Sequence, residues 1–125
     1  MIRFTVEQVE LQHHYLMEQS GGMEGVRDAG LLESALGAPF QTYAGQYLYP
    51  SAQQKAARLC YALVSNHPFI DGNKRIGVHL MLLFLEAHGL SIQCEQNELV
   101  SLGLALASGR MNDQDVVQWI LERQR

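Results

Sequence analysis

The sequence predicts an all-α fold, with about six helices packed around one central apolar helix. The run IGVHLMLLFL at residues 76–85 is apolar on nearly every face of a helix, which suits the centre of a bundle. Helix-capping signals recur along the chain, and no alternating run is strong enough to indicate a sheet. We therefore expect one compact helical domain spanning residues 1–125.

The first predicted helix begins after Thr5, which can form a capping box with Gln8, and it ends at the glycine pair that starts at Gly21. His13 falls on the apolar stripe of this helix. A histidine facing a core is more often a hydrogen-bonded packing residue than a ligand. His14 is expected on the solvent side.

The second predicted helix starts at Asp28, its N-cap, and runs to about Leu36. A functional role for Arg27 and Asp28 stays open, but we favour a local helix cap and an ion pair between them. The next stretch, FQTYAGQYLYP at residues 40–50, is the least helical part of the chain. Its aromatic residues are either a docking surface or a small core under a long loop, and both interpretations stay open: Phe40, Tyr43, Tyr47 and Tyr49.

A third helix is expected from the capping box of Ser51 and Gln54 to about Asn66. The central helix should run from about Lys74 to His88. Residues 91–95 alternate briefly and predict a short extended piece. Two further helices are then expected, one over residues 98–108 and one capped by Asn112 with Asp115.

The composition of the chain excludes some classes of function. The formal net charge of −4 argues against a general nucleic-acid binder, so we expect no direct nucleic-acid partner. No N-terminal signal-like segment is apparent and the central apolar run is too short for a bilayer, so we expect a cytoplasmic protein without a membrane partner. Cys60 and Cys94 lie on different kinds of segment, which favours free thiols.

The polar stretch HPFIDGNKR leads directly into the central helix. Pro68, Gly72 and Asn73 suit a turn, with Asn73 expected as the N-cap. The free N–H groups at the start of a helix form an anion site, and Lys74 and Arg75 add two positive charges there. The stretch therefore predicts a phosphate-binding loop, although a turn of this composition also joins helices without any function.

Each polar residue of this loop has a chemical use if the ligand is a nucleotide. His67 could take a proton from an incoming hydroxyl, because histidine titrates near neutral pH. Asp71 offers an oxygen ligand for Mg²⁺, Arg75 can clamp phosphate, and Asn73 can donate an amide N–H. Phe69 is expected to turn inward and anchor the loop.

HPFIDGNKR resembles the signature of the Fic/Doc family. It departs at Lys74, where the Fic branch has its second glycine, and at Val78, where that branch has its second arginine. The lysine is typical of the Doc, or death-on-curing, branch, whose members are toxins of type II toxin–antitoxin systems. The matching positions are His67, Phe69, Asp71, Gly72, Asn73 and Arg75.

The resemblance implies an all-α fold and a protein Ser/Thr kinase that uses ATP and Mg²⁺. It implies a translation elongation factor as target, with elongation factor Tu as the candidate, and a cognate antitoxin as partner. His67 would be the base, Asp71 would hold Mg²⁺, and phosphates would meet Gly72, Asn73, Lys74 and Arg75. In Fic relatives a flap that aligns the target lies before the signature, and residues 40–50 are our candidate for it.

Three alternatives stay open. AMP transfer, the Fic reaction, ranks second because Lys74 would fill the anion hole that the Fic glycine leaves open, and because Val78 replaces an arginine that holds the terminal phosphate. Gly72 counts mildly in its favour, since Doc toxins can carry alanine there. A nucleotide-binding module without chemistry and a metal hydrolase using His67 and Asp71 are the other two.

The segment SGGMEG at residues 20–25 also fits the inhibitory pattern of Fic proteins, which we interpret as coincidence because two glycines disfavour a helix.

Overall fold

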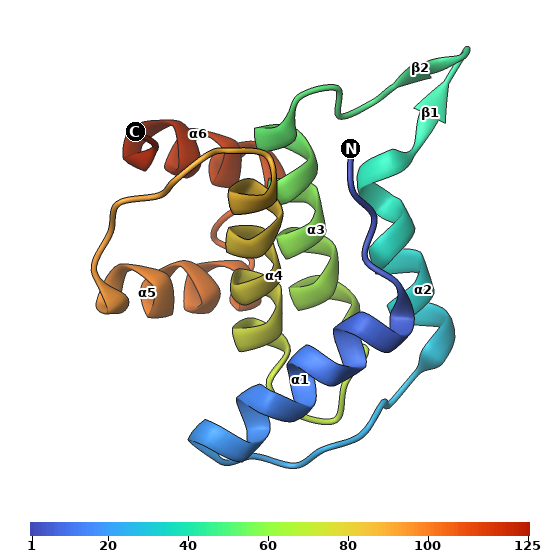
Figure 1. Ribbon diagram of the computed structural model, residues 1–125, viewed down its shortest axis with the longest axis vertical. Helices are drawn as coiled ribbons and strands as arrows, with labels where there is room; N and C mark the ends of the chain where they lie inside the picture. The colour runs from blue at the N-terminus through green and yellow to red at the C-terminus, as the bar shows by residue number, and fades with distance from the viewer.

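The computed structural model describes residues 1–125 and contains six α-helices, one short 3₁₀ helix and one two-stranded hairpin (Figure 1). The all-α prediction is confirmed. The elements in chain order are α1 (Val6–Ser20), α2 (Ala29–Gly37), η1 (Ala38–Phe40), β1 (Thr42–Tyr43), β2 (Gln46–Tyr47), α3 (Ala52–Asn66), α4 (Asn73–Ala87), α5 (Gln96–Ala107) and α6 (Asp113–Arg123).

The two helices α3 and α4 lie side by side at the centre of the molecule (Figure 1). They approach closely at Gly77, where a Cβ atom would stand 2.9 Å from Cγ2 of Val64 and 3.2 Å from the carbonyl oxygen of Cys60. The apolar run of α4 is buried as predicted, and α3 shares the central position. The fully buried apolar side chains of the pair include Leu63, Ile76, Leu80, Met81, Phe84 and Leu85.

The other helices surround this pair. The helix α1 crosses one end of the pair, α2 packs against α3, and α5 and α6 cover the opposite side (Figure 1). The core is closed on the α6 side by Val116, Trp119 and Ile120.

Four predicted N-caps are present in the structure. The Thr5 and Ser51 side chains form complete capping boxes with Gln8 and Gln54, the Asp28 carboxylate accepts from the Leu31 N–H at 2.9 Å, and α6 begins with the box of Asn112 and Asp115. These caps fix where the helices start, so their first residues were predictable.

The start of α4 differs from the prediction. The helix begins at Asn73, and its N-cap is Gly72, which has φ +77° and supplies no side-chain hydrogen bond. The prediction that Asn73 caps the helix was therefore wrong, because the Asn73 side chain turns back to the preceding loop instead.

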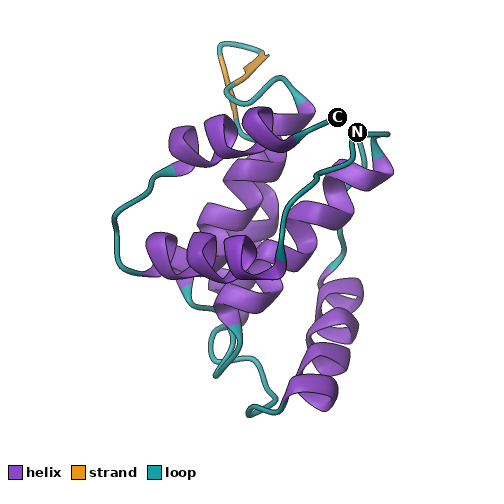
Figure 2. Ribbon diagram, turned by 90° about the vertical axis from the view of Figure 1, so that its left-hand side faces the viewer, coloured by secondary structure: helices purple, strands orange, loops and turns teal.

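The aromatic segment after α2 forms a β-hairpin that the sequence did not indicate. Thr42 pairs with Tyr47 and Tyr43 with Gln46, and the ribbon projects from the helical body (Figure 2). Ala44 and Gly45 make the turn with φ values of +52° and +78°. Positive φ at both turn positions defines a tight hairpin turn, but Ala-Gly is a weak signal for it compared with Asn-Gly.

Three smaller expectations can be compared directly with the structure. Ile92 forms a β-bridge with Gln124, so the short extended piece is confirmed. Cys60 and Cys94 are unpaired, and burial raises the pKa of the Cys60 thiol to about 12. None of the helices has the length and apolar character needed to cross a bilayer.

Candidate active site

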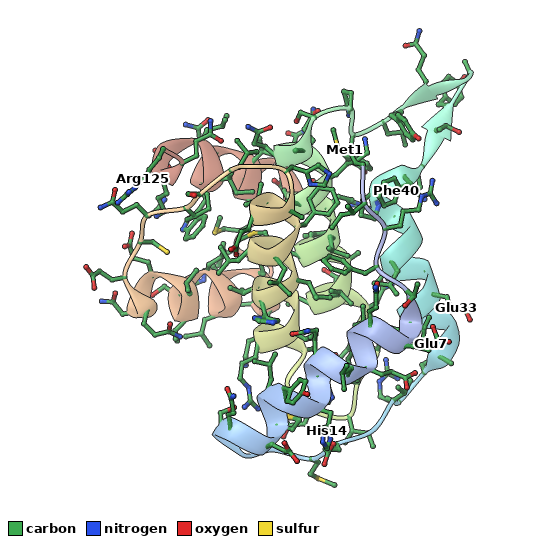
Figure 3. The ribbon with its side chains drawn as sticks, viewed as in Figure 1. Met1, Glu7, His14, Glu33, Phe40 and Arg125 are labelled. Atoms are coloured by element: carbon green, nitrogen blue, oxygen red, sulfur yellow. The ribbon has the colours of Figure 1, made fainter.

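The loop that joins α3 to α4, residues 67–72, lies at the end of the bundle that α1 crosses. His14 marks this end on α1 (Figure 3). The segment between α1 and α2 runs past the same loop and makes five hydrogen bonds with it. Three parts of the chain that are distant in sequence therefore build one site.

The outer side of the loop is held by the segment that precedes α2. The backbone N–H groups of Arg27 and Asp28 both donate to the Pro68 carbonyl oxygen, at 2.7 and 3.0 Å, and the Ile70 N–H donates to the Gly25 carbonyl at 3.0 Å. Val26 and Phe69 form an antiparallel bridge between these hydrogen bonds. The loop backbone is thus fixed as if it were the edge of a small sheet.

The inner side of the loop is held by Phe69 and Asn73. Phe69 is 1% exposed, so the predicted loop anchor is confirmed. The Asn73 amide donates to the Phe69 carbonyl and accepts from the Phe69 N–H, both at 2.9 Å. Asn73 therefore shapes the loop through its side chain, and a role in phosphate binding stays a prediction for this residue.

Asp71 presents a carboxylate whose two oxygens are already hydrogen-bonded. The Met23 N–H donates to Oδ2 at 3.1 Å and the Gly72 N–H to Oδ1 at 2.8 Å. These two N–H groups, in that order, lower the pKa of Asp71, with a further contribution from the Arg75 charge against the opposing effect of burial. The carboxylate is accordingly kept as an anion, the form that would hold Mg²⁺.

The Arg75 guanidinium lies under the segment that follows α1. It donates to the Ser20 hydroxyl, to the Gly21 carbonyl at 2.8 Å and to the Met17 sulfur at 3.8 Å. A Cβ atom on Gly22 would stand 3.0 Å from both the Arg75 and Asp71 side chains, and the φ of +131° at Gly22 favours glycine. Residues 20–23 thus cover two of the charged groups that the sequence assigned to the site.

The segment at residues 20–25 is not a helix beyond Ser20. Its acidic residue, Glu24, pairs with His14 on α1 and makes no contact with Arg75. A helical inhibitory segment is therefore absent at this position.

His67 and Lys74 are the exposed members of the site. His67 ends α3 in the left-handed conformation, with φ +54° and ψ +52°. The stem of Lys74 packs on α5 at Gly103, where a Cβ atom would lie 3.3 Å from the Lys74 Cβ. Both side chains remain available to a ligand at the start of α4.

The α4 N-terminus can itself bind an anion. The helices α1, α2, α3 and α6 have side-chain caps, whereas α4 has none, so its first N–H groups lack an intramolecular acceptor from a cap. A 15-residue helix places positive potential at this end, next to Lys74 and Arg75. The structure thus brings together an exposed imidazole, a carboxylate and an uncapped helix N-terminus.

A comparison with known proteins places the residues of this site within a known family. The family model described as the Fic/DOC family matches residues 3–85, which include the whole site. The chain belongs to the Fic/DOC family. Its relatives include the toxin Doc of Mycolicibacterium smegmatis, 39% identical over 75 residues, or 60% of this chain and 58% of that protein. Another is the protein kinase doc of Escherichia phage P1, 27% identical over 112 residues, or 90% of this chain and 87% of that protein.

Membership of the Fic/DOC family makes the two departures from the Fic signature informative. Lys74 is exposed at the first turn of α4. Val78 lies one turn further along, nearly buried, and lines the same groove as Lys74 and Arg75. This Fic/DOC chain thus has a cation where the Fic branch has glycine, and an apolar residue where that branch has arginine.

A groove of about 450 Å³ opens beside the site of this Fic/DOC domain, between α1, α4 and α5. His67 and Asp71 lie outside its lining, whereas Lys74 and Arg75 lie at its edge. Its apolar lining consists of Leu16, Val78, Leu82, Leu99, Val100 and Leu104.

The hairpin of this Fic/DOC domain carries two of the three tyrosines singled out in the sequence, and Tyr49 follows its second strand. Tyr43 is 78% exposed and Tyr47 49% exposed, while Tyr49 is partly buried. Lys55 of α3 supports the ribbon, because its ammonium lies 4.1 Å from the centre of the Tyr47 ring and donates to the Tyr49 carbonyl. Tyr43 and Tyr47 therefore do not form a core under a loop, and their role in docking a target stays a prediction.

Two residues act at the site in ways that the sequence interpretation did not describe. Arg27 forms no ion pair with Asp28, so that prediction was wrong; its guanidinium binds the carbonyl oxygens of Asn66 and His67. His13 is a buried packing residue as predicted, but its partner is the site loop, since it stacks on Phe69 and donates to the Asp71 carbonyl at 2.7 Å. Pairings over such distances along the chain leave no local sequence signal.

Proposed function

We propose that this chain is a Doc-type toxin that transfers the γ-phosphoryl group of ATP to a hydroxyl of a target protein. The observation that carries the proposal is the uncapped N-terminus of α4, which has two cations in its first turn and follows a loop with a histidine and a carboxylate. Phosphoryl transfer depends mostly on positioning and charge stabilisation, so a small rigid loop suffices for it. The names of the two relatives, a toxin and a protein kinase, support the same activity.

Each site residue has a role in this proposal. His67 takes the proton of the target hydroxyl as the hydroxyl oxygen attacks the γ-phosphorus, the bond from that phosphorus to the bridging oxygen breaks, and ADP leaves. The backbone N–H groups from Asn73 onward, together with Lys74 and Arg75, stabilise the negative charge of the phosphate oxygens, whereas the Gly72 N–H is already bound to Asp71. Arg75 can form a bidentate contact, whereas Lys74 acts as a compact point charge.

The donor set is compatible with Mg²⁺ held jointly with a nucleotide. Asp71 is a single carboxylate, and no cluster of three metal-binding side chains exists in the chain. Mg²⁺ in phosphoryl-transfer sites is commonly held by one or two carboxylates together with substrate phosphates, so one aspartate is sufficient. When bound there, the ion would neutralise charge on the phosphates. The absence of further ligands argues against the metal-hydrolase alternative.

AMP transfer is the second candidate reaction. Two observations rank it below phosphoryl transfer. Lys74 projects from the first turn of α4, where the Fic glycine would leave space for a phosphate, and Val78 provides no charge in the groove.

The groove between α1, α4 and α5 is our candidate for the antitoxin site. Six of its thirteen lining residues are apolar, and Lys74 and Arg75 add two positive charges to the lining. An amphipathic partner helix with apolar residues on one face and a carboxylate at the end near Arg75 would fit both features. Such a partner would also block the phosphate site.

The exposed hairpin is our candidate for target docking. Its strands are solvent-exposed, so an extended segment of a target could pair along an edge. The target class that the Doc resemblance implies is a translation elongation factor.

The experiment that tests the proposal labels bacterial lysate with the purified chain, Mg²⁺, and ATP carrying label at either the γ- or the α-phosphate. We expect a protein band labelled from the γ-phosphate only. His67→Ala should lose this band, while His88→Ala, a change at the far end of α4, should keep it.

Label from the α-phosphate alone, lost with His67→Ala, would establish AMP transfer instead. Undiminished labelling by His67→Ala would remove His67 as the base. If the native chain transfers label from neither the γ- nor the α-phosphate, the remaining alternative is a nucleotide-binding module without chemistry.

A further inference from the structure

Arg27 holds the two carbonyl oxygens at the end of α3. Its Nε donates to the His67 carbonyl at 2.7 Å, and one terminal nitrogen donates to the Asn66 carbonyl at 3.0 Å. Carbonyl groups at a helix C-terminus lack intrahelical donors, and a cation is favourable at that end of the helix dipole. Arg27 therefore satisfies these carbonyls although it lies 40 residues earlier in the chain.

The backbone of His67 needs such support. Its left-handed conformation, with φ +54° and ψ +52°, is unfavourable for a residue other than glycine. The residue on either side is held separately, because the Asn66 amide donates to the Leu31 carbonyl and Pro68 accepts two N–H groups. For His67 itself, the side-chain contact that fixes the peptide orientation comes from Arg27.

We propose that Arg27 is a positioning residue for His67. It sets the direction of the His67 Cα–Cβ bond by fixing the peptide that follows, and thereby the position of the imidazole. This inference rests on the proposed function, in which His67 is the base. The Arg27 guanidinium is engaged by two carbonyls, so we assign it no contact with the nucleotide.

The kinetic test compares Arg27→Met with the native chain, using the initial rate of γ-phosphate transfer at varied ATP. We expect the maximal rate to fall on the order of 10²-fold, the cost of a displacement of about 1 Å, with no change in KM for ATP. Arg27→Lys has a single ammonium group in place of the forked guanidinium, and its maximal rate should lie between those of the native chain and Arg27→Met. Arg110→Met, which removes an exposed arginine beyond α5, is the matched control and should keep the native rate.

A double variant separates positioning from an independent role. In a His67→Ala background, assayed at an enzyme concentration high enough to measure its residual rate, Arg27→Met should cause no further loss of that rate, because the aligned group is already gone. A further loss of rate in that background, or a raised KM for ATP with the maximal rate unchanged, would overturn the proposal.

Nuclear magnetic resonance gives a readout that does not depend on activity. Arg27→Met should shift the His67 imidazole and amide signals while the His88 signals stay in place. Unchanged His67 signals overturn the proposal. If the native chain shows no transfer, the proposed function fails, and the spectra still decide whether Arg27 positions His67. If Arg27→Met does not fold, the same spectra of Arg27→Lys decide it.

Discussion

The imidazole of His13 lies flat on the ring of Phe69, with ring centroids 3.9 Å apart and planes 7° from parallel. The same imidazole donates through Nε2 to the Asp71 carbonyl at 2.7 Å. One side chain of α1 thus contacts both the buried anchor and the carboxylate-bearing residue of the loop. The position of α1 and the shape of the site are therefore linked.

Replacing His13 should destabilise the protein more than a surface change on the same helix. His13→Ala removes an aromatic pair worth about 0.5–1.5 kcal/mol and leaves the Asp71 carbonyl without its donor, at about 1–3 kcal/mol. We expect the free energy of unfolding to fall by about 2–4 kcal/mol, measured by urea denaturation. Glu10→Ala on the exposed face should stay within about 0.5 kcal/mol, and an equal loss for both variants would contradict the link.

Asn73 should contribute to stability more than to ligand contact. Asn73→Ala leaves the buried N–H and carbonyl of Phe69 unsatisfied, each at about 1–3 kcal/mol. We expect the free energy of unfolding, measured by urea denaturation, to fall by about 2–4 kcal/mol. Asn97→Ala, at an exposed position of α5, is the control. A native-like midpoint combined with lost ATP binding would instead assign Asn73 to the phosphates.

Local sequence signals predicted the helices well because each signal needs only neighbouring residues. The capping boxes of Thr5 and Ser51 and the caps at Asp28 and Asn112 gave four helix starts. Phe69 was recognisable as an anchor by its aromatic side chain, whereas its apolar neighbour Ile70 is 46% exposed. The start of α4 was misassigned because asparagine is a good N-cap by type, while the buried Phe69 backbone competes for its amide.

The parts of the site that could not be predicted depend on contacts between distant segments. Nothing near Arg27 indicates that its guanidinium reaches the end of α3, and nothing near Gly22 indicates that it lies over Asp71 and Arg75. The hairpin was missed because its turn has alanine at a position with φ +52°. Tertiary contacts here override local preference.

Lys74 should decide which phosphorus atom reacts. Lys74→Gly removes the charge and the side chain from the first turn of α4 and opens the space that Fic relatives leave for phosphate. We expect weaker labelling from the γ-phosphate and new labelling from the α-phosphate in the lysate assay. Lys74→Arg retains a cation and should keep γ-phosphate transfer. An unchanged product from Lys74→Gly would show that this residue does not set the reaction.

The pair formed by His14 and Glu24 should make the segment over the site sensitive to pH. The hydrogen bond to Glu24 is the largest cause that raises the pKa of His14, and the charge of Glu18, 3.1 Å away, adds to it. Because the folded pKa lies above the ordinary value of 6.5, the pair stabilises the fold fully below that value and is lost as pH rises through the raised pKa. Glu24 is the neighbour of Met23, whose N–H binds Asp71, so the loss should loosen the cover over the carboxylate.

The His14 titration by nuclear magnetic resonance measures this directly. Glu24→Gln should lower the His14 pKa toward its ordinary value, and Glu18→Gln should lower it less, since the hydrogen bond to Glu24 is the larger cause. His79 is an internal control, because burial lowers its pKa and its partner is Gln12, so neither change should move it. Backbone relaxation of Met23 should show more motion above the His14 titration than below it. The same His14 titration in the native chain and in Glu24→Gln would mean that the pair does not hold the segment, and that the Met23 and Asp71 contact keeps it in place at every pH.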